Sequence, residues 1–147
     1  MIHGKNPAPV PAQLRLTGED LVLREWTEND LPAMTGLFDD PEIAHWTPLG
    51  EVLVIRQNAN GLTASLGYSV GAAHRGRRLG ARALTVMTEY AHHALDLPRS
   101  TLSIATDNAA SAAVARAAGY HLTDEPPTTT VRRGWSLTLR TWARDRP

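Results

Sequence analysis

The sequence predicts one mixed α/β domain built around a mixed sheet. Strand-like and helix-like patterns follow each other in the order strand, helix, hairpin, helix, strand, helix, strand, strand, which is typical of α/β folds. The chain has 147 residues, of which 42% are hydrophobic, and this suffices for one domain with a buried core. We expect a flexible, proline-rich tail at residues 1–13 and a single domain at residues 14–147.

The first half of the chain predicts a strand or hairpin, a helix and a second hairpin. Residues 14–26 alternate as a strand or hairpin does, and residues 27–40 place apolar residues at helical spacing behind several N-cap candidates. Residues 51–57 and 62–70 are two strand-like runs. They are joined by a segment that ends in Asn60-Gly61, a strong signal for a hairpin turn.

Residues 79–95 predict an amphipathic helix. Their apolar residues recur at helical spacing, and Pro98 follows closely enough to end the helix. The predicted apolar stripe consists of Leu79, Ala83, Val86, Met87, Tyr90 and Ala94.

The last third of the chain predicts a strand, a helix and two final strands. Residues 100–106 are rich in β-branched side chains and indicate a strand. Residues 107–120 indicate a helix with Asp107 or Asn108 as its N-cap and Gly119 as its C-terminal stop. The final strands are expected at residues 121–125 and 134–144, with residues 126–134 as a loop between them.

Composition excludes several kinds of site. The chain has no cysteine, which rules out a thiol nucleophile, a cysteine-ligated metal and a disulfide. The six histidines form no ligand pattern, and His92 and His93 point apart on a helix, so we expect no metal. No apolar run is long enough to span a membrane and no signal-peptide core is present, so we expect a cytoplasmic protein without a membrane partner.

Residues 70–84 form a basic stretch with four arginines, three glycines and no acidic residue. The stretch connects a predicted strand to a predicted helix, and the first N–H groups of a helix lack internal partners and favour phosphate. Gly76 and Gly80 let the backbone approach a ligand closely, while neighbouring arginines add charge. The stretch therefore predicts a pyrophosphate cradle. The alternative is a turn whose arginines only face solvent.

Two blocks of the sequence occur in a recognisable order. Residues 75–80 read Arg-Gly-Arg-Arg-Leu-Gly, and Asn108-x-x-Ser111 precedes Ala118-Gly119-Tyr120. Together these blocks resemble the GCN5-related N-acetyltransferase (GNAT) superfamily, most closely its ribosomal-protein N-terminal acetyltransferase branch, over residues 14–145. The pyrophosphate signature of that family is [QR]-x-x-G-x-[GA], so Arg78 stands where the family has its middle glycine.

The resemblance implies the GNAT acyl-CoA N-acyltransferase fold, here shortened between the first helix and the central hairpin. It implies that acetyl-CoA, as co-substrate, lies in a V-shaped opening between two parallel strands, at residues 62–70 and 100–107. An amine then attacks the thioester directly. Asn108 would contact the pantetheine arm, and the other residues implied in holding acetyl-CoA are Ser69, Val70, Gly71, Arg75, Gly76, Arg77, Arg78, Leu79, Gly80 and Ala81.

Direct attack needs a donor for the departing thiolate. Much of the family uses a tyrosine at the position of Ala115, so that route is missing. Ser111 is the catalytic candidate because its hydroxyl lies by a helix N-terminus, where negative charge is favoured. The alternative is that Ser111 is an ordinary first-turn residue. For Tyr120 we expect core packing.

Direct attack also needs a base to deprotonate the amine. Related sequences often have a glutamate where this chain has Ser65, which is a poor base. A water chain, or a carboxylate of the acidic first third such as Glu51, can substitute. His74 belongs to the phosphate loop, and we interpret it as a bystander.

The sequence thus favours an acetyl-CoA-dependent N-acetyltransferase that acts on a primary amine, either a protein N-terminus or a small molecule. One alternative is a CoA-binding protein of the same fold with weak or no catalysis, which Ser65 and Ala115 would allow. Another is a nucleic-acid binder that uses the arginines of residues 75–82. The net charge of zero and the aromatic content of 5% count against this last class, so we expect no nucleic-acid partner.

Overall fold

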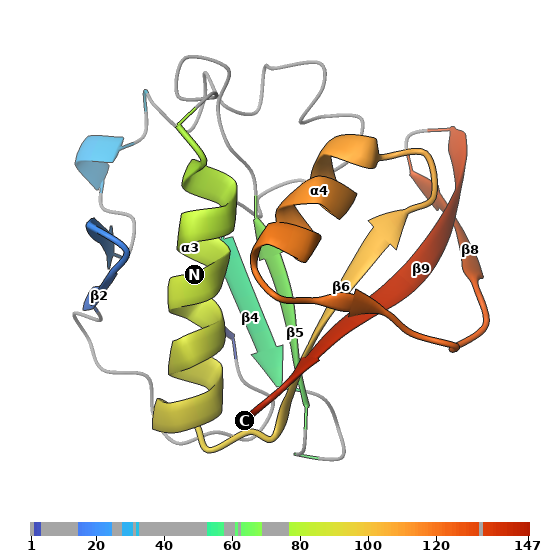
Figure 1. The fold of residues 1–147 in the computed structure, drawn as a ribbon. Coiled ribbons are helices and arrows are strands. Elements are labelled where there is room, and N and C mark those ends of the chain that lie inside the picture. Colours follow the sequence, from blue (N-terminus) through green and yellow to red (C-terminus); the bar gives the residue numbers. More distant parts are fainter. Residues whose placement is uncertain are drawn as a thin grey trace.

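The structure is a computed structural model that describes residues 2–3, 15–24, 28–30, 32, 53–57, 61, 63–68, 77–132 and 134–147. It is a mixed α/β fold in which helices lie side by side over one face of a mixed sheet (Figure 1). The helices of this layer are α3 (Leu79–Glu89), its π-helical continuation η3 (Tyr90–Ala94) and α4 (Ala109–Ala117).

The main sheet has the strand order β1-β4-β5-β6-β9-β7, with β8 also paired to β9. The pairs β1–β4 and β5–β6 are parallel and the other pairs are antiparallel, which confirms the predicted mixed sheet. Its strands are β1 (Ile2–His3), β4 (Leu53–Gln57), β5 (Thr63–Tyr68), β6 (Arg99–Ala105), β7 (His121–Leu122), β8 (Thr128–Arg132) and β9 (Trp135–Asp145).

A separate hairpin lies beside α3. Its strands are β2 (Arg15–Gly18) and β3 (Leu21–Arg24), so the first strand-like pattern is a hairpin. A Cβ placed on Gly18 would lie 3.1 Å from Val86 Cγ2, which shows how closely the hairpin backbone packs on α3. Of the helix expected at residues 27–40, only a 3-10 turn (Glu28–Asp30) and residue 32 are described. The predicted shortening after that helix lies outside the described residues.

One expectation about strands needs correction. Residues 126–134 were expected to be a loop, but β8 pairs there with β9, from Thr128 opposite Leu139 to Arg132 opposite Trp135. A run of threonines is polar, yet its β-branched side chains favour the extended backbone that pairing with β9 requires. At the other end of the chain, Ile2–His3 pair in parallel with β4. The division of the chain into tail and domain stays a prediction.

The buried face of α3 differs from the predicted stripe. Val86 and Met87 of the predicted stripe are buried, but Leu84 and Ala91 are buried as well and Ala94 is exposed. The same face carries Thr88, which is fully buried. Its hydroxyl donates to Leu84 O at 2.7 Å, so its burial leaves no polar group without a partner. The prediction counted only apolar residues and so left out Thr88, a polar residue whose hydroxyl is hydrogen-bonded within the helix. The predicted stripe is therefore rotated around the helix axis relative to the buried face.

The elements that follow α3 agree closely with the sequence. Asn108 is the N-cap of α4 and accepts a hydrogen bond from Ser111 N at 3.1 Å. The helix ends in a Schellman motif: Tyr120 N donates to Ala115 O, and Gly119 N donates to Arg116 O. Gly119 has φ +85°, the left-handed conformation that glycine adopts without strain, so its role as a stop signal is confirmed.

Candidate functional site

The main sheet opens between its two central parallel strands. β5 and β6 pair only at their starts, from Thr63 opposite Arg99 to Ser65 opposite Thr101. Beyond these pairs β5 continues to Tyr68 and β6 to Ala105, and the two strands diverge (Figure 1). Both α3 and α4 begin at this open end, and a crevice at the carboxyl ends of parallel strands is where α/β folds bind ligands.

The N-terminus of α3 presents to this region backbone donors that have no partner among the described residues. The first helical hydrogen bond runs from Arg82 N to Arg78 O, so the N–H groups of residues 79–81 precede the helical ladder. No side chain in the described part of the chain caps this end. Arg78 is left-handed, with φ 57° and ψ 27°, and Leu79 begins the helix, so successive N–H groups form a concave, anion-binding nest.

The conformation of residue 78 accounts for the glycine that the family signature has at this position. Position 78 takes the left-handed conformation in which glycine has no steric penalty, and glycine is what the signature has there. An arginine in this conformation costs about 1–2 kcal/mol. Such strain is characteristic of functional sites, so the arginine at position 78 calls for a compensating role.

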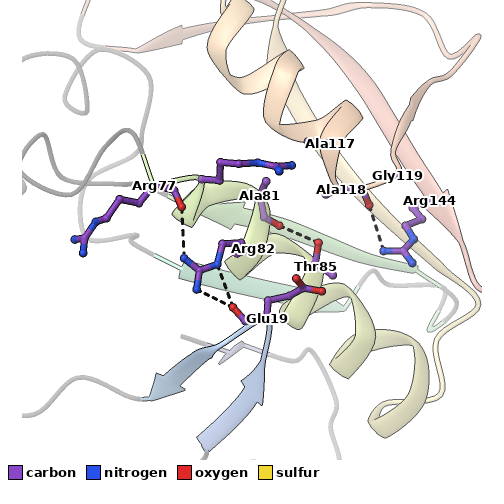
Figure 2. Close-up of a pocket in the computed structure, with 10 residues that line it drawn as sticks. Glu19, Arg77, Ala81, Arg82, Thr85, Ala117, Ala118, Gly119 and Arg144 are labelled. Atoms are coloured by element: carbon purple, nitrogen blue, oxygen red, sulfur yellow. Dashed lines mark hydrogen bonds between the residues drawn. The ribbon is translucent and has the colours of Figure 1, made fainter.

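A cavity of about 520 Å³ lies against the first turns of α3. Its walls come from α3, from the last turn of α4, from the β2–β3 turn and from β9 (Figure 2). The lining residues are Glu19, Arg77, Arg78, Ala81, Arg82, Thr85, Ala117, Ala118, Gly119 and Arg144. Of the residues that the sequence predicts for acetyl-CoA, Arg77, Arg78 and Ala81 therefore lie at this cavity.

Arg82 holds the hairpin against α3. Its guanidinium donates to Glu19 O at 3.0 Å and 2.8 Å and to Asp20 O at 3.4 Å. Glu19 and Asp20 both have positive φ, at 51° and 58°, so they form a strained two-residue turn that these bonds stabilise. The basic stretch at residues 70–84 thus contains both residues that line the cavity and a residue that positions its wall.

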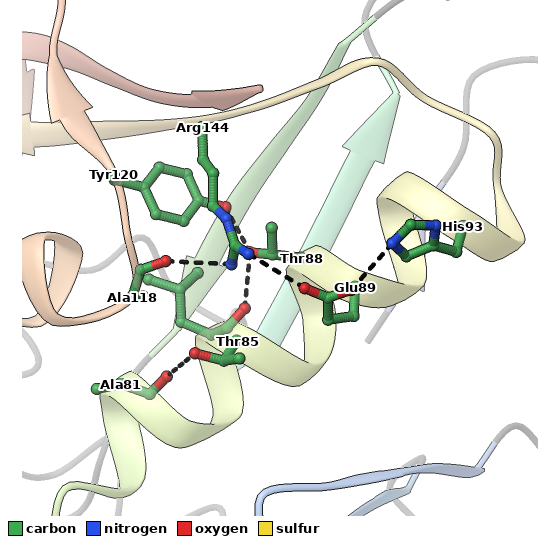
Figure 3. A network of polar contacts seen from close by, with 9 residues as sticks. Ala81, Thr85, Thr88, Glu89, His93, Ala118, Tyr120 and Arg144 are labelled. Carbon is green, nitrogen blue, oxygen red and sulfur yellow. Dashed lines mark hydrogen bonds and ion pairs between the residues drawn. The ribbon is translucent and has the colours of Figure 1, made fainter. Parts of the chain in front are cut away.

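Arg144 is a cavity residue that sequence reasoning missed. It lies on β9, and its guanidinium donates to Ala118 O at 3.2 Å and to Glu89 Oε1 at 3.1 Å (Figure 3). These bonds fix Arg144 beside the end of α4. Nothing in the local sequence around residue 144 indicates this role, because only the pairing of β9 with β6 brings it there.

Tyr120 packs in the core, as predicted. It is 4% exposed, and its hydroxyl lies 2.6 Å from Thr88 Oγ1, so the pair joins α3 to the end of α4 (Figure 3). Burial raises the pKa of Tyr120, and the hydrogen bond with Thr88 opposes that rise in part.

Asn108 and Ser111 lie together at the first turn of α4, beside the open end of the sheet. The side-chain oxygen of Asn108 is used to cap Ser111 N, which leaves the amide nitrogen for other contacts. Ser111 is half-buried. Its position in the first turn is confirmed, while its catalytic role stays a prediction. Ala115, at the family's tyrosine position, is fully buried.

The expected base position carries no carboxylate. Ser65 is half-buried, and its hydroxyl lies 3.3 Å from that of Thr101, across the last pair before the strands separate. Several other predicted residues lie outside the described part of the chain: Glu51, Ser69, Val70, Gly71, His74, Arg75 and Gly76.

The described residues contain neither a metal-ligating cluster nor a membrane-spanning helix. No group of three or more His, Cys, Asp or Glu side chains there can hold a metal ion. No helix among them has the length and apolar character needed to cross a membrane.

Comparison with known proteins gives a family match. The family model for the "Acetyltransferase (GNAT) domain" matches residues 47–121, about half of the chain. No curated protein matches the sequence.

Solved structures give a fold match over almost the whole chain. A GNAT-family acetyltransferase from Bacillus anthracis has a TM-score of 0.77 and 14% identity, with 90% of this chain and 98% of that chain covered. The ribosomal-protein-S5-alanine acetyltransferase from Vibrio fischeri has a TM-score of 0.74 and 15% identity, covering 90% and 96%. Spermidine N-acetyltransferase from Vibrio cholerae, solved with CoA and spermine, has a TM-score of 0.67 and 11% identity, covering 82% and 92%.

Proposed function

The chain belongs to the GNAT acetyltransferase family, and from this premise we propose that it is an acetyl-CoA-dependent N-acetyltransferase acting on a primary amine. The observation that carries the proposal is the start of α3, where N–H groups without a partner in the described part of the chain follow Arg78 in its left-handed conformation. This phosphate-binding geometry lies beside the divergence of β5 and β6. The proposal keeps the cytoplasmic location that the sequence predicted.

In this proposal the backbone holds most of acetyl-CoA. The amides at the start of α3 bind the pyrophosphate, and the pantetheine arm enters the opening between β5 and β6. Asn108 contacts that arm through the side-chain nitrogen that capping leaves free. The full proposed binding set is Ser69, Val70, Gly71, Arg75, Gly76, Arg77, Arg78, Leu79, Gly80, Ala81 and Asn108.

The proposed reaction is a direct transfer. The amine nitrogen attacks the thioester carbonyl carbon, the C–N bond forms, the C–S bond breaks and CoA leaves as a thiolate. A base takes the proton of the amine, and we assign this to a water chain or to a carboxylate such as Glu51. The hydroxyl of Ser111 donates a hydrogen bond to the developing thiolate, where the N-terminus of α4 also favours negative charge.

The names of similar structures suggest which amines to test. One similar structure is named for an alanine of a ribosomal protein, and another is named for spermidine. The first agrees with the resemblance of this sequence to the ribosomal-protein branch. A peptide with an N-terminal alanine is therefore the first acceptor to test, and spermidine is the second.

A second candidate function is CoA binding without turnover. It is favoured by Ser65 and Ala115, which stand where related sequences carry a glutamate and a tyrosine. Under this reading, CoA binds at α3 and no amine is acetylated.

An acetyl-transfer assay with both acceptors tests the proposal. CoA release is followed with a thiol reagent, and since the chain has no cysteine, the signal comes from CoA alone. We expect thiol release that depends on the acceptor, together with a mass increase of one acetyl group on the amine. Binding of acetyl-CoA without release for any acceptor of a broad amine panel would support the second candidate instead.

A further inference from the structure

Three residues with a strained backbone are gathered around one side chain. Among the described residues, four that are not glycine have positive φ: Glu19, Asp20, Arg78 and Asp96. The first three are bonded to Arg82, which donates to Glu19 O and Asp20 O through its guanidinium and to Arg78 O through its backbone N–H. Residues held in unfavourable conformations cluster at functional sites. This arrangement therefore indicates a role for Arg82 beyond attaching the hairpin to α3.

Arg82 holds both peptide groups that flank residue 78. Its Nη1 donates to Arg77 O at 3.4 Å (Figure 2), and its backbone N–H donates to Arg78 O at 3.0 Å. The first carbonyl belongs to the peptide group before residue 78, and the second belongs to the peptide group after it. Because peptide groups are planar, their orientations set φ and ψ of the residue between them. Arg82 therefore favours the left-handed conformation of Arg78.

The turn of the β2–β3 hairpin orients the guanidinium of Arg82. Nε and Nη2 donate to Glu19 O at 3.0 Å and 2.8 Å, and Nη2 also donates to Asp20 O. A guanidinium is planar and rigid, so bonds on one edge set the direction of the donor on the other edge, which here is Nη1. The hairpin thus orients Arg82, and Arg82 in turn orients the backbone at the start of α3.

The conformation of Arg78 determines whether the nest exists before a ligand arrives. The nest requires a left-handed residue 78 next to the helical Leu79, because only then do successive N–H groups point to one side. If residue 78 left this conformation, the nest would have to form again on binding. A protein whose binding-competent conformation is only partly populated binds its ligand more weakly by that fraction.

We propose that Arg82 is a positioning residue that preforms the phosphate site by holding Arg78 in its left-handed conformation, and that the turn of the β2–β3 hairpin is part of this device. The inference rests on the proposed function, since it needs acetyl-CoA as the ligand. It gives Arg82 no contact with acetyl-CoA. The guanidinium acts through the backbone of residues 77 and 78.

Titration calorimetry of acetyl-CoA with variants of Arg82 tests the inference. Arg82→Gln should weaken binding by about tenfold, the factor that corresponds to the penalty of a left-handed residue with a side chain. Arg82→Lys keeps the positive charge but lacks the planar fork, so it should weaken binding by a similar factor. If Arg82→Lys kept the affinity of the unmodified protein, charge alone would matter and the inference would be overturned.

A double-variant cycle with Arg78→Gly separates positioning from direct contact. Glycine adopts the left-handed conformation without a steric penalty, so it needs little help from residue 82. In the Arg78→Gly background, Arg82→Gln should therefore weaken acetyl-CoA binding by no more than about twofold. An equal loss of affinity in both backgrounds would mean that Arg82 contacts the ligand itself, and the positioning role would be overturned.

Asp20→Gly is the matched control for stability. It relieves the strain of a residue with φ 58°, so it should raise the melting temperature of Arg82→Gln and keep that variant folded. It should not restore the affinity for acetyl-CoA, because it leaves residue 78 unsupported. Restored affinity would mean that Arg82→Gln acts only through general stability, against the inference.

The titrations also separate this inference from the proposed function. Unchanged affinity in Arg82→Gln would overturn the positioning role and leave the proposed function standing. Failure of the unmodified protein to bind acetyl-CoA would overturn both.

Discussion

Replacing Arg78 by glycine should stabilise the protein. Arg78 has φ 57°, and a left-handed conformation costs a residue with a side chain about 1–2 kcal/mol. Glycine removes that cost but loses about 0.5–1 kcal/mol through its greater freedom in the unfolded chain. The balance is a gain of about 0.5–1 kcal/mol, or a rise of about 2–3 °C in melting temperature for a chain of this size.

Two variants at the same place act as controls in the same thermal unfolding assay. Arg78→Ala removes the guanidinium but keeps the left-handed penalty, so it should be no more stable than the unmodified protein. Arg77 is not among the residues with positive φ, so Arg77→Gly should lower stability by about 0.5–1 kcal/mol. If Arg78→Gly were no more stable than Arg78→Ala, the reasoning from backbone strain would be refuted.

Other predictions concern Ser111, Thr88 and His92. Ser111→Ala should lower turnover by about 100-fold in the acetyl-transfer assay while acetyl-CoA affinity stays nearly unchanged, because charge on sulfur develops only in the transition state. If the variant lost stability but kept its rate, Ser111 would be a structural residue. Thr88→Val should cost about 1–3 kcal/mol in denaturant unfolding, since it leaves the hydroxyl of Tyr120 unpaired, and adding Tyr120→Phe should recover most of this loss. Burial lowers the pKa of His92, and the positive charge of Arg144 lowers that pKa further. Below about pH 6.5, His92 therefore binds a proton in the unfolded chain but stays neutral in the folded protein. Stability should therefore fall as the pH drops below that value, and His92→Leu should flatten this dependence; an equal slope in both proteins would count against the burial argument.

The parts of the fold with local sequence signals could be predicted. Asn108 and Gly119 carry the start and stop signals of α4 in their own side chains and backbone, and both were found as expected. The hairpin of β4 and β5 was indicated by Asn60-Gly61, and the two strands pair as expected. Such features depend on a few neighbouring residues.

The parts that depend on distant partners could not be predicted. β8 is a strand because β9 offers it a pairing edge, and its threonines gave no alternation of polar and apolar residues. Arg144 reaches the cavity only through the register of the sheet. The sequence showed that Arg78 replaces the glycine of the family signature. It did not show that this residue has a strained, left-handed backbone, which only the structure reveals.

The central claim is that the start of α3 binds acetyl-CoA, and titration calorimetry of acetyl-CoA tests it most directly. The unmodified protein should bind saturably, and a ligand concentration of about 100 times the dissociation constant should stabilise the fold by about 2.7 kcal/mol. Gly80→Asp should abolish binding, because it places a carboxylate where the backbone of the first turn meets phosphate. Gly80 is buried, so a melting curve of the variant is measured beside its titration to separate lost binding from lost folding. Gly80→Ala, which adds a methyl group without charge, separates the effect of charge from that of size. If the unmodified protein showed no heat of binding and no thermal shift with saturating acetyl-CoA, the claim would be contradicted.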